Sequence, residues 1–416
     1  MTTPNTPGGR VFSVGPAATA WSRPGQEAQL GAHNAPPLAV HDSESPWPQN
    51  QVGALVIGAG ITGWTTALVL ARRGWQVVLA ADRFGIEAVS TADSALWEWP
   101  SSPCDRRSNH KMLDRSAAWA MRSYLRFCQL APNSRTGVSL RTAVFHFTRP
   151  VEEDPTEFAK MVEIERHVPG YVHDPTLIDA HGVSPDAGVV DAYSYLAPTI
   201  DTDWYLTWLA REAEAAGVTA VVRRIRGPLV EQEERLRVEH GAEVIINCTG
   251  LGARELAADP SVHPRPEALL RIVNDGPRAP RVTAAHVMKN PPHADTETPI
   301  YVVPRGVHRL LLGGPVEPVH HDIDPSLANH PSLQRMLDRW TEVLPALRGA
   351  RLDDLDPLRV GVQPFRPGGV RLETQPGTRI VHNYGHGAAG VTLSWGCAQE
   401  VADLACAVLA KRWVKP

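Results

Sequence analysis

Cysteine is scarce in this sequence of 416 residues, and long apolar runs are absent. The five cysteines, Cys104, Cys128, Cys248, Cys397 and Cys406, are odd in number and widely spaced, with no Cys-X-X-Cys motif. A disulfide framework and a zinc site are therefore not expected, and reduced thiols in the cytoplasm are predicted instead. No stretch of about 18 apolar residues could span a membrane. The N-terminus also lacks a basic region followed by an apolar stretch, so no secretory signal is expected.

An excess of basic residues is also missing. The chain has 41 Lys and Arg residues against 45 Asp and Glu residues, which gives a net charge of −4. A nucleic-acid-binding protein would need a basic patch or stripe, so no nucleic-acid partner is predicted. His320 and His321 precede Asp322 and Asp324. Adjacent side chains on a strand point to opposite faces, so we interpret this segment as a solvated loop and expect no metal site.

Residues 1–50 differ in composition from the rest of the chain. They are rich in Pro, Gly, Ala and Ser, and their apolar residues follow no helical or strand period. We expect a flexible extension without a function of its own, and a partial lid over the functional site is the alternative. The remaining length suits two domains better than one.

A strand–turn–helix–strand unit begins at residue 52. Residues 52–57 (VGALVI) form a short apolar run, as in a buried parallel strand, and a glycine-rich turn, GAGITG, follows. Gly58 permits a tight turn, Gly60 lets the backbone approach a pyrophosphate, and Gly63 lets helix and strand pack closely. Asp82 ends the second strand 24 residues after Gly58, where it can accept hydrogen bonds from a ribose. The unit predicts a dinucleotide site with the pyrophosphate at a helix N-terminus.

A second glycine-rich turn near the end of the chain favours FAD over a nicotinamide cofactor. The turn YGHGAAG, residues 384–390, lies between a predicted strand at 379–384 and a predicted helix at 392–412. A helix N-terminus at this turn can stabilise negative charge on a reduced flavin ring. We therefore expect this helix to pack beside the first strand–helix unit.

The centre of the chain alternates between helix and strand patterns. Residues 205–216 have helical spacing, and residues 218–225 and 243–247 are strand-like. Residues 298–304 and 308–314 are predicted to form neighbouring antiparallel strands.

Several of these segments together resemble a known family. Residues 382–400 (HNYGHGAAGVTLSWGCAQE) are similar to the C-terminal signature of the D-amino-acid oxidases and D-aspartate oxidases. The segments GAGITG, ADRF, ALWE and NCTG match in the same order, and the resemblance covers about residues 52–414. It implies an α/β fold in which a doubly wound, Rossmann-like FAD-binding domain is interleaved with a substrate domain carrying a mostly antiparallel mixed sheet. The expected division is 1–50 extension, 51–130, 201–260 and 356–416 FAD-binding domain, and 131–200 and 261–355 substrate domain.

The resemblance also implies an activity. A hydride passes from the carbon of a C–N bond to flavin N5, and O2 then reoxidises the flavin with release of hydrogen peroxide. The expected partner is a small amine or amino acid, and the family leaves a homodimer open. Together with the first glycine turn, the resemblance assigns these residues to cofactor binding: Gly58, Ala59, Gly60, Ile61, Thr62, Gly63, Asp82, Arg83, Ser90, Thr91, Ala95, Leu96, Ile225, Gly250, Gly387, Ala388, Gly390, Val391 and Thr392.

The predicted substrate site departs from the family pattern. Gln363 stands where the family has an arginine that holds the substrate carboxylate, whereas the family tyrosine is kept as Tyr301. Glutamine cannot form that charged bidentate pair. Glu98 and Glu297 replace a glutamine and a second tyrosine of the animal enzymes and would add negative charge. We therefore assign Tyr301, Gln363 and Glu98 to the catalytic site.

The altered charge predicts an unusual substrate, either an amine or an amino acid whose carboxylate is masked as an ester, an amide or a carrier-bound thioester. A conventional D-amino-acid oxidase, in which Arg366 or Arg305 replaces the missing arginine, is the first alternative. We expect both arginines to pack or pair at the surface instead. A diverged flavin-binding protein without oxidase chemistry is the second alternative, because a fold alone does not prove a function.

Overall fold

The computed structural model describes residues 52–85, 95–100, 110–276, 280–289, 299–315 and 331–410. The N-terminal extension, Ser90, Thr91, Glu297 and the His320–Asp324 segment lie outside these ranges, so their predictions are not tested. No helix within the described ranges is long and apolar enough to cross a bilayer.

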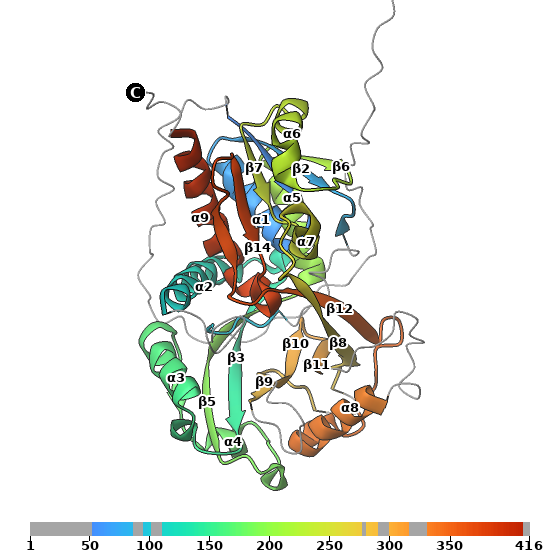
Figure 1. The fold of residues 1–416 in the computed structure, drawn as a ribbon. Coiled ribbons are helices and arrows are strands. Elements are labelled where there is room, and N and C mark those ends of the chain that lie inside the picture. Colours follow the sequence, from blue (N-terminus) through green and yellow to red (C-terminus); the bar gives the residue numbers. More distant parts are fainter. Residues whose placement is uncertain are drawn as a thin grey trace, which may run out of the picture.

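The first of two sheets is the doubly wound part of the fold (Figure 1). Its strand order is β13-β14-β7-β1-β2-β6, and all neighbours run parallel except the edge strand β13. All five residues of β1 are buried, because helices cover both faces of a parallel sheet. The strands are β1 (Gly53–Ile57), β2 (Gln76–Ala81), β6 (Thr219–Val222), β7 (Val244–Asn247), β13 (Arg371–Thr374) and β14 (Ile380–Tyr384).

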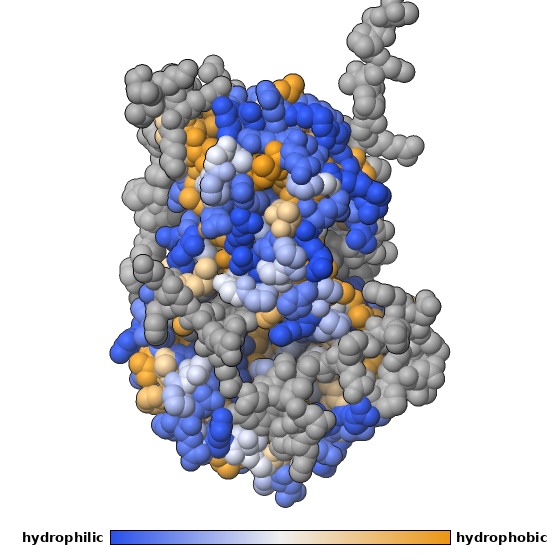
Figure 2. Space-filling view, in the orientation of Figure 1, coloured by the Kyte–Doolittle hydropathy of each residue, from blue (hydrophilic) through white to orange (hydrophobic). Residues whose placement is uncertain are grey.

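Two helix layers enclose this sheet. One face packs against α1 (Ile61–Arg72), α5 (Thr202–Ala215) and α9 (Gly390–Ala410), and the other against α6 (Glu233–Glu239) and α7 (Ala253–Leu256). Figure 2 shows mainly hydrophilic side chains over the outer side of the upper half of the molecule, as expected for helices whose apolar sides face a sheet. The first domain therefore has the layered α/β architecture that the sequence predicts.

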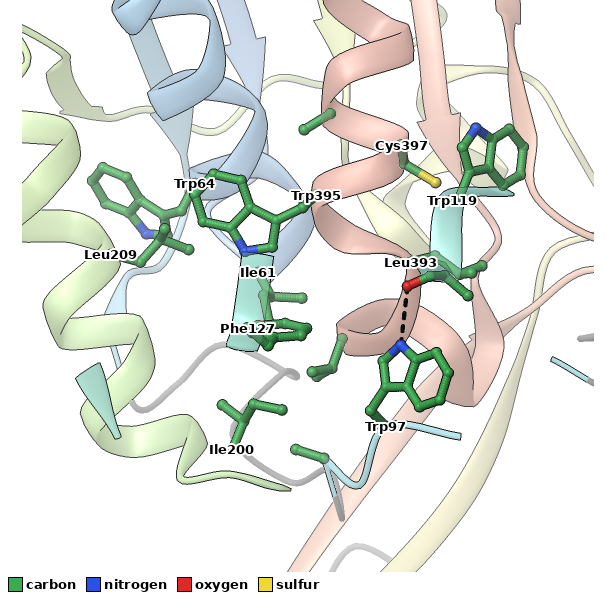
Figure 3. Packing of buried hydrophobic residues seen from close by; sticks show 14 of the residues in the cluster. Ile61, Trp64, Trp97, Trp119, Phe127, Ile200, Leu209, Leu393, Trp395 and Cys397 are labelled. Atoms are coloured by element: carbon green, nitrogen blue, oxygen red, sulfur yellow. Dashed lines mark hydrogen bonds between the residues drawn. The ribbon is translucent and has the colours of Figure 1, made fainter. Parts of the chain in front are cut away.

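Helix α9 packs beside α1, as expected, although more than 300 residues separate them. A Cβ at Gly396 would lie 2.3 Å from the backbone oxygen of Trp119 in α2 (His110–Leu130), so a glycine is needed where α9 meets α2. Figure 3 shows Trp64, Phe127 and Trp395 close together in this core. In the same view, the indole nitrogen of Trp97 donates to the backbone oxygen of Ala120 over 3.1 Å.

The second sheet is mixed and mostly antiparallel. Its order is β12-β8-β11-β10-β9-β3-β5-β4, with β3 and β9 as the parallel pair. Helix α8 (Pro331–Val343) covers one face with Leu333, Met336 and Trp340, below the sheet in Figure 1. The strands are β3 (Val138–Phe147), β4 (Val172–His173), β5 (Asp191–Ile200), β8 (His263–Val273), β9 (Ala285–Met288), β10 (Ile300–Arg305), β11 (Arg309–Pro315) and β12 (Leu358–Phe365).

The chain passes repeatedly between the two sheets. We expected the chain to return to the first sheet for the last time at residue 356. β12 instead pairs with β8 in the second sheet, so the return follows Phe365. The remaining helices are α3 (Pro155–His167) and α4 (Leu177–Ala180), both beside the second sheet (Figure 1).

Candidate active site

A cavity opens at the carboxyl ends of β1, β2 and β7, where ligands bind in doubly wound folds. It continues to β12 and to the turn before α9, so both glycine-rich turns contribute to one site. Its lining includes the predicted residues Gly58, Ala59, Gly60, Ile61, Thr62, Asp82, Arg83, Ile225, Gly250, Gln363, Gly387 and Gly390.

The first glycine turn is shaped by close backbone contacts. Gly58 has a φ of +110°, and a Cβ there would lie 2.4 Å from the carbonyl oxygen of Cys248. A Cβ at Gly63 would lie 1.8 Å from the carbonyl oxygen of Gly58. Gly63 therefore serves the packing of helix against strand and lies behind the cavity wall. Gly60 caps α1 without a side chain, so the helix N-terminus presents backbone N–H groups and its positive dipole end to the cavity.

Charged side chains gather at the side of the cavity where β2 and β6 end. Asp82 follows β2 and is exposed, with the Arg83 guanidinium 3.9 Å from its carboxylate. Arg223 and Arg224 follow β6 and line the same end, beside Ile225. Sequence reasoning missed both arginines, because the end of β6 becomes a neighbour of Asp82 only when β6 pairs with β2.

The C-terminal turn forms the opposite wall. An ideal Cβ at Gly390 would lie 3.9 Å from the Ile61 side chain, so this turn lies against the first turn of α1. His386 is buried at the cavity, and burial lowers its pKa to about 4, so the imidazole is neutral at pH 7. Within the described residues, its Nε2 atom has no hydrogen-bond partner. Ala388, Val391 and Thr392, which we also expected to contact the cofactor, do not line the cavity. Ala388 is exposed, and Val391 and Thr392 are buried.

Ala95 and Leu96 lie at the junction of the two sheets. Ala95 has a positive φ of 47°, and its carbonyl oxygen accepts a hydrogen bond from the Ile200 N–H. Leu96 forms an antiparallel bridge with Thr199 of β5. We expected both residues to contact the cofactor, but neither is among the residues that line the cavity. Both hold the 95–100 segment against the second sheet.

Tyr301 lies across a glycine on the neighbouring strand. In the β10–β11 register Tyr301 pairs with Gly313, and a Cβ at Gly313 would lie 2.2 Å from the tyrosine ring. The ring therefore extends over β11 toward β8. Any side chain at position 313 would displace it.

The Tyr301 hydroxyl and the Gln363 side-chain amide both donate hydrogen bonds to the carboxylate of Glu267 on β8. Glu267 is only 8% exposed, and Gln363 also lines the cavity. We refer to Glu267, Tyr301 and Gln363 as the Glu267 trio. The trio joins β8, β10 and β12 on one face of the second sheet.

Glu98 lies in a different electrostatic setting. Its carboxylate binds the ammonium groups of Lys160 and Lys289, whose side chains are 3% and 6% exposed. A Glu157 carboxylate oxygen lies 4.0 Å from the Lys160 nitrogen, so two carboxylates balance two ammonium groups. Burial raises the pKa of Glu98, but attraction to the two lysines outweighs it and lowers that pKa to about 2. Our expectation that Glu98 adds uncompensated negative charge is therefore corrected. These four residues are the Glu98 cluster below.

The two arginines considered as replacements for Gln363 have protein partners. Arg305 is buried and donates to the backbone oxygen of Ile200 and to the Thr202 hydroxyl. The Arg366 guanidinium donates to the Asp259 carboxylate over 2.9 Å and to the Gly369 carbonyl oxygen over 3.1 Å. Both arginines pair with protein groups as expected, but Arg305 does so in the interior and not at the surface.

Comparison with known proteins identifies the family. The family described as FAD dependent oxidoreductase matches residues 54–404. This chain belongs to that family. A relative named D-amino-acid oxidase from Rubrobacter xylanophilus is 33% identical over 86% of this chain and 96% of its own. One with the same name from Streptomyces coelicolor is 35% identical over 84% of this chain and 96% of its own. The fold is similar to that of glycine oxidase from Geobacillus kaustophilus, with a TM-score of 0.66, 18% identity and coverage of 85% and 94% of the two chains.

FAD is the cofactor of this family, and the cavity suits it. Close backbone contacts at Gly58 and Gly63 fix the shape of the glycine turn, and the N-terminus of α1 favours the negative charge of a pyrophosphate. The Nε2 atom of His386, which has no hydrogen-bond partner among the described residues, gives the far wall a polar atom for a ring. Residues 58–62, Asp82 and the cavity-lining residues of the C-terminal turn, His386, Gly387 and Gly390, would hold FAD.

Sequence reasoning missed Glu267, Lys160 and Lys289. A signal for Glu267 was present, since it is a carboxylate at the start of the apolar run EALLRIV. A buried strand rarely carries an acidic residue without a structural or functional reason.

Proposed function

We propose that this FAD-dependent oxidoreductase oxidises a C–N bond in an amine, or in an amino acid whose carboxylate is masked. Bound FAD supplies a hydride acceptor at N5. The substrate loses a hydride from the carbon and a proton from the neutral nitrogen, and the resulting imine takes up water to give a carbonyl compound and the released amine. O2 is the proposed final acceptor, taking two electrons and two protons to become hydrogen peroxide.

The observation that carries this proposal is the hydrogen-bond direction in the Glu267 trio. The two groups expected to hold a substrate carboxylate, Tyr301 and Gln363, both donate to Glu267. A substrate carboxylate at this position would approach another carboxylate that is nearly buried. Leaving a buried charge without compensation costs about 3–5 kcal/mol, or at least a hundredfold in rate or affinity.

A conventional D-amino-acid oxidase is the second candidate function. The relatives of 33% and 35% identity carry that name, which favours it. The neutralised Glu98 also removes one of the carboxylates that would repel an acidic substrate. For this candidate, the substrate carboxylate would have to bind away from the Glu267 trio.

The rate of anaerobic flavin reduction by D-alanine and by D-alaninamide tests the proposal. The two compounds share the same reacting carbon and differ in the carboxylate. We expect the amide to reduce the flavin at least about tenfold faster. Faster reduction by D-alanine would support the conventional oxidase. A carrier-bound substrate, a homodimer and a cytoplasmic location stay predictions from the sequence.

A further inference from the structure

We infer that the His386 imidazole donates a hydrogen bond from its Nε2 atom to the flavin ring, and that this bond stabilises the ring in its reduced form. His386 is not among the cofactor residues that the sequence and the family resemblance assign. The inference concerns a contact with FAD, so it holds whichever amine or amino acid is oxidised.

The unpaired nitrogen of His386 gives the first argument. The residue is 4% exposed and lines the cavity, and its Nε2 atom has no hydrogen-bond partner among the described residues. A buried polar atom without a partner costs free energy, so folded proteins rarely contain one without a structural or functional reason. A ligand in the cavity can supply the missing partner.

The backbone of the C-terminal turn fixes the position of this side chain. The glycines on either side, Gly385 and Gly387, have φ values of +82° and +55°, in the left-handed region that favours glycine. A Cβ at Gly385 would lie 2.9 Å from the side chain of Arg366, which donates to the Asp259 carboxylate. The turn therefore holds the imidazole at the cavity wall, and a bound ligand need not order it.

The layout of the cavity favours the flavin ring over the rest of FAD as the partner of His386. Asp82, after β2, marks the adenosine end of the cavity, and the N-terminus of α1 would hold the pyrophosphate. The part of the cavity between the C-terminal turn and Gln363 of β12 is then left for the ring. His386 lines this part.

The chemistry of the ring favours a proton on Nε2. The pyrimidine part of a flavin has two carbonyl oxygens and unprotonated ring nitrogens but a single N–H group, so most of its edge accepts hydrogen bonds. Burial lowers the pKa of His386 to about 4, and the neutral imidazole has one N–H to donate. Uptake of two electrons and one proton leaves a negative charge on the ring. Because hydrogen bonds to charged acceptors are roughly twice as strong as neutral ones, the donor stabilises the reduced ring more than the oxidised ring.

The test measures the midpoint potential of bound FAD against a reference dye in the native protein and in two variants. His386→Met and His386→Gln introduce side chains of similar length, and only glutamine keeps an N–H donor. We expect His386→Met to lower the equilibrium constant for two-electron reduction about tenfold, which corresponds to about 30 mV, and His386→Gln to lower it less than about threefold. His308→Leu, an exposed substitution in the turn between β10 and β11, should leave the potential unchanged.

A measurement on the native protein keeps the inference testable if His386→Met binds FAD poorly. With histidine isotopically labelled at its ring nitrogens, nuclear magnetic resonance should show a protonated Nε2 whose signal shifts on flavin reduction and is missing from His386→Gln. A signal that does not respond to reduction would overturn the inference.

The two variants also separate the ring from other partners. Equal potentials in the native protein and both variants, or equal losses in the two variants, would overturn the inference. If His386→Met weakens FAD binding at an unchanged potential, the imidazole binds another part of FAD and the inference fails. If only the KM for the substrate rises, the imidazole binds the substrate and the inference fails as well.

Discussion

Two glutamates, the half-buried Glu98 and the buried Glu267, differ in what surrounds them. Glu98 binds two lysines and belongs to a cluster without net charge, whereas the oxygens of Glu267 accept from a tyrosine hydroxyl and a glutamine amide. The first arrangement resembles a structural ion network, which stabilises only when it is complete. The second joins three strands of the second sheet and reaches the cavity through Gln363. The environment of a carboxylate, more than its presence in the sequence, thus separates a structural role from recognition.

The largest expected effect comes from breaking the Glu98 cluster. Lys289→Met removes one ammonium group from the Glu98 carboxylate and should lower the free energy of unfolding by about 3–5 kcal/mol. Chemical denaturation of the FAD-free protein measures the change. Glu267→Gln should cost less than half as much, because the Tyr301 hydroxyl and the Gln363 amide can still hydrogen bond to an amide. Similar losses for the two variants would contradict the comparison.

The pH dependence of stability sharpens the same contrast. The pKa of Glu98 is depressed from 4.5 to about 2 in the folded protein. Its contribution is therefore fully present above pH 4.5 and is lost as the pH falls toward 2. The shift corresponds to about 3 kcal/mol. The free energy of unfolding is measured with denaturant at several pH values for the native protein and for Glu98→Gln. The slopes of this free energy against pH should differ only below about pH 4.5. Identical slopes in that range would show that Glu98 is not held ionised by the lysines.

Replacing the negative charge of the Glu267 trio with a positive one should make the protein accept a substrate with a free carboxylate. Gln363→Arg alone should raise the rate with D-alanine by less than about tenfold, since the new guanidinium pairs with Glu267. Combined with Glu267→Gln, the arginine can bind a substrate carboxylate, and the rate should rise by roughly a hundredfold. Steady-state peroxide release measures both variants. Equal gains in the single and the double variant would mean that Glu267 does not compete for the arginine.

The smallest expected effect tests the position of Tyr301. Gly313→Ala places a methyl group where the tyrosine ring lies and should lower the rate of flavin reduction about tenfold, through displacement of the trio. FAD content and the visible spectrum should stay unchanged, because Gly313 lies outside the cofactor cavity. Gly306→Ala, in the turn between β10 and β11 with a φ of +60° and open space around it, controls for a substitution that strains the backbone without touching the ring. An unchanged rate in Gly313→Ala would argue against a role for the ring.

Local patterns were sufficient to predict the cofactor half of the fold. Apolar runs, glycine spacing and an acidic strand end all occur within about 30 residues, so GAGITG and Asp82 could be interpreted directly. The C-terminal turn could be associated with them through the family resemblance. Gly63 also has the packing role predicted for it, with its Cβ position against the Gly58 oxygen.

The substrate half could be predicted only in part, because its contacts join distant segments. Gln363 was identified by its position in a motif, but its partner Glu267 is 96 residues away and becomes a neighbour through the β8–β12 register. Glu98 was identified as a charge, yet its lysines lie 62 and 191 residues away on a helix and beyond a strand. A single sequence contains no signal for such pairings, so the sign of the local field could not be deduced.

The ratio of flavin reduction rates for D-alaninamide and D-alanine, measured in the native protein and in Gln363→Arg/Glu267→Gln, tests the central claim most directly. We expect a ratio above about ten in the native protein and below one in the double variant. A ratio below one in the native protein, unchanged by the two substitutions, would contradict the claim that the Glu267 trio selects against a substrate carboxylate.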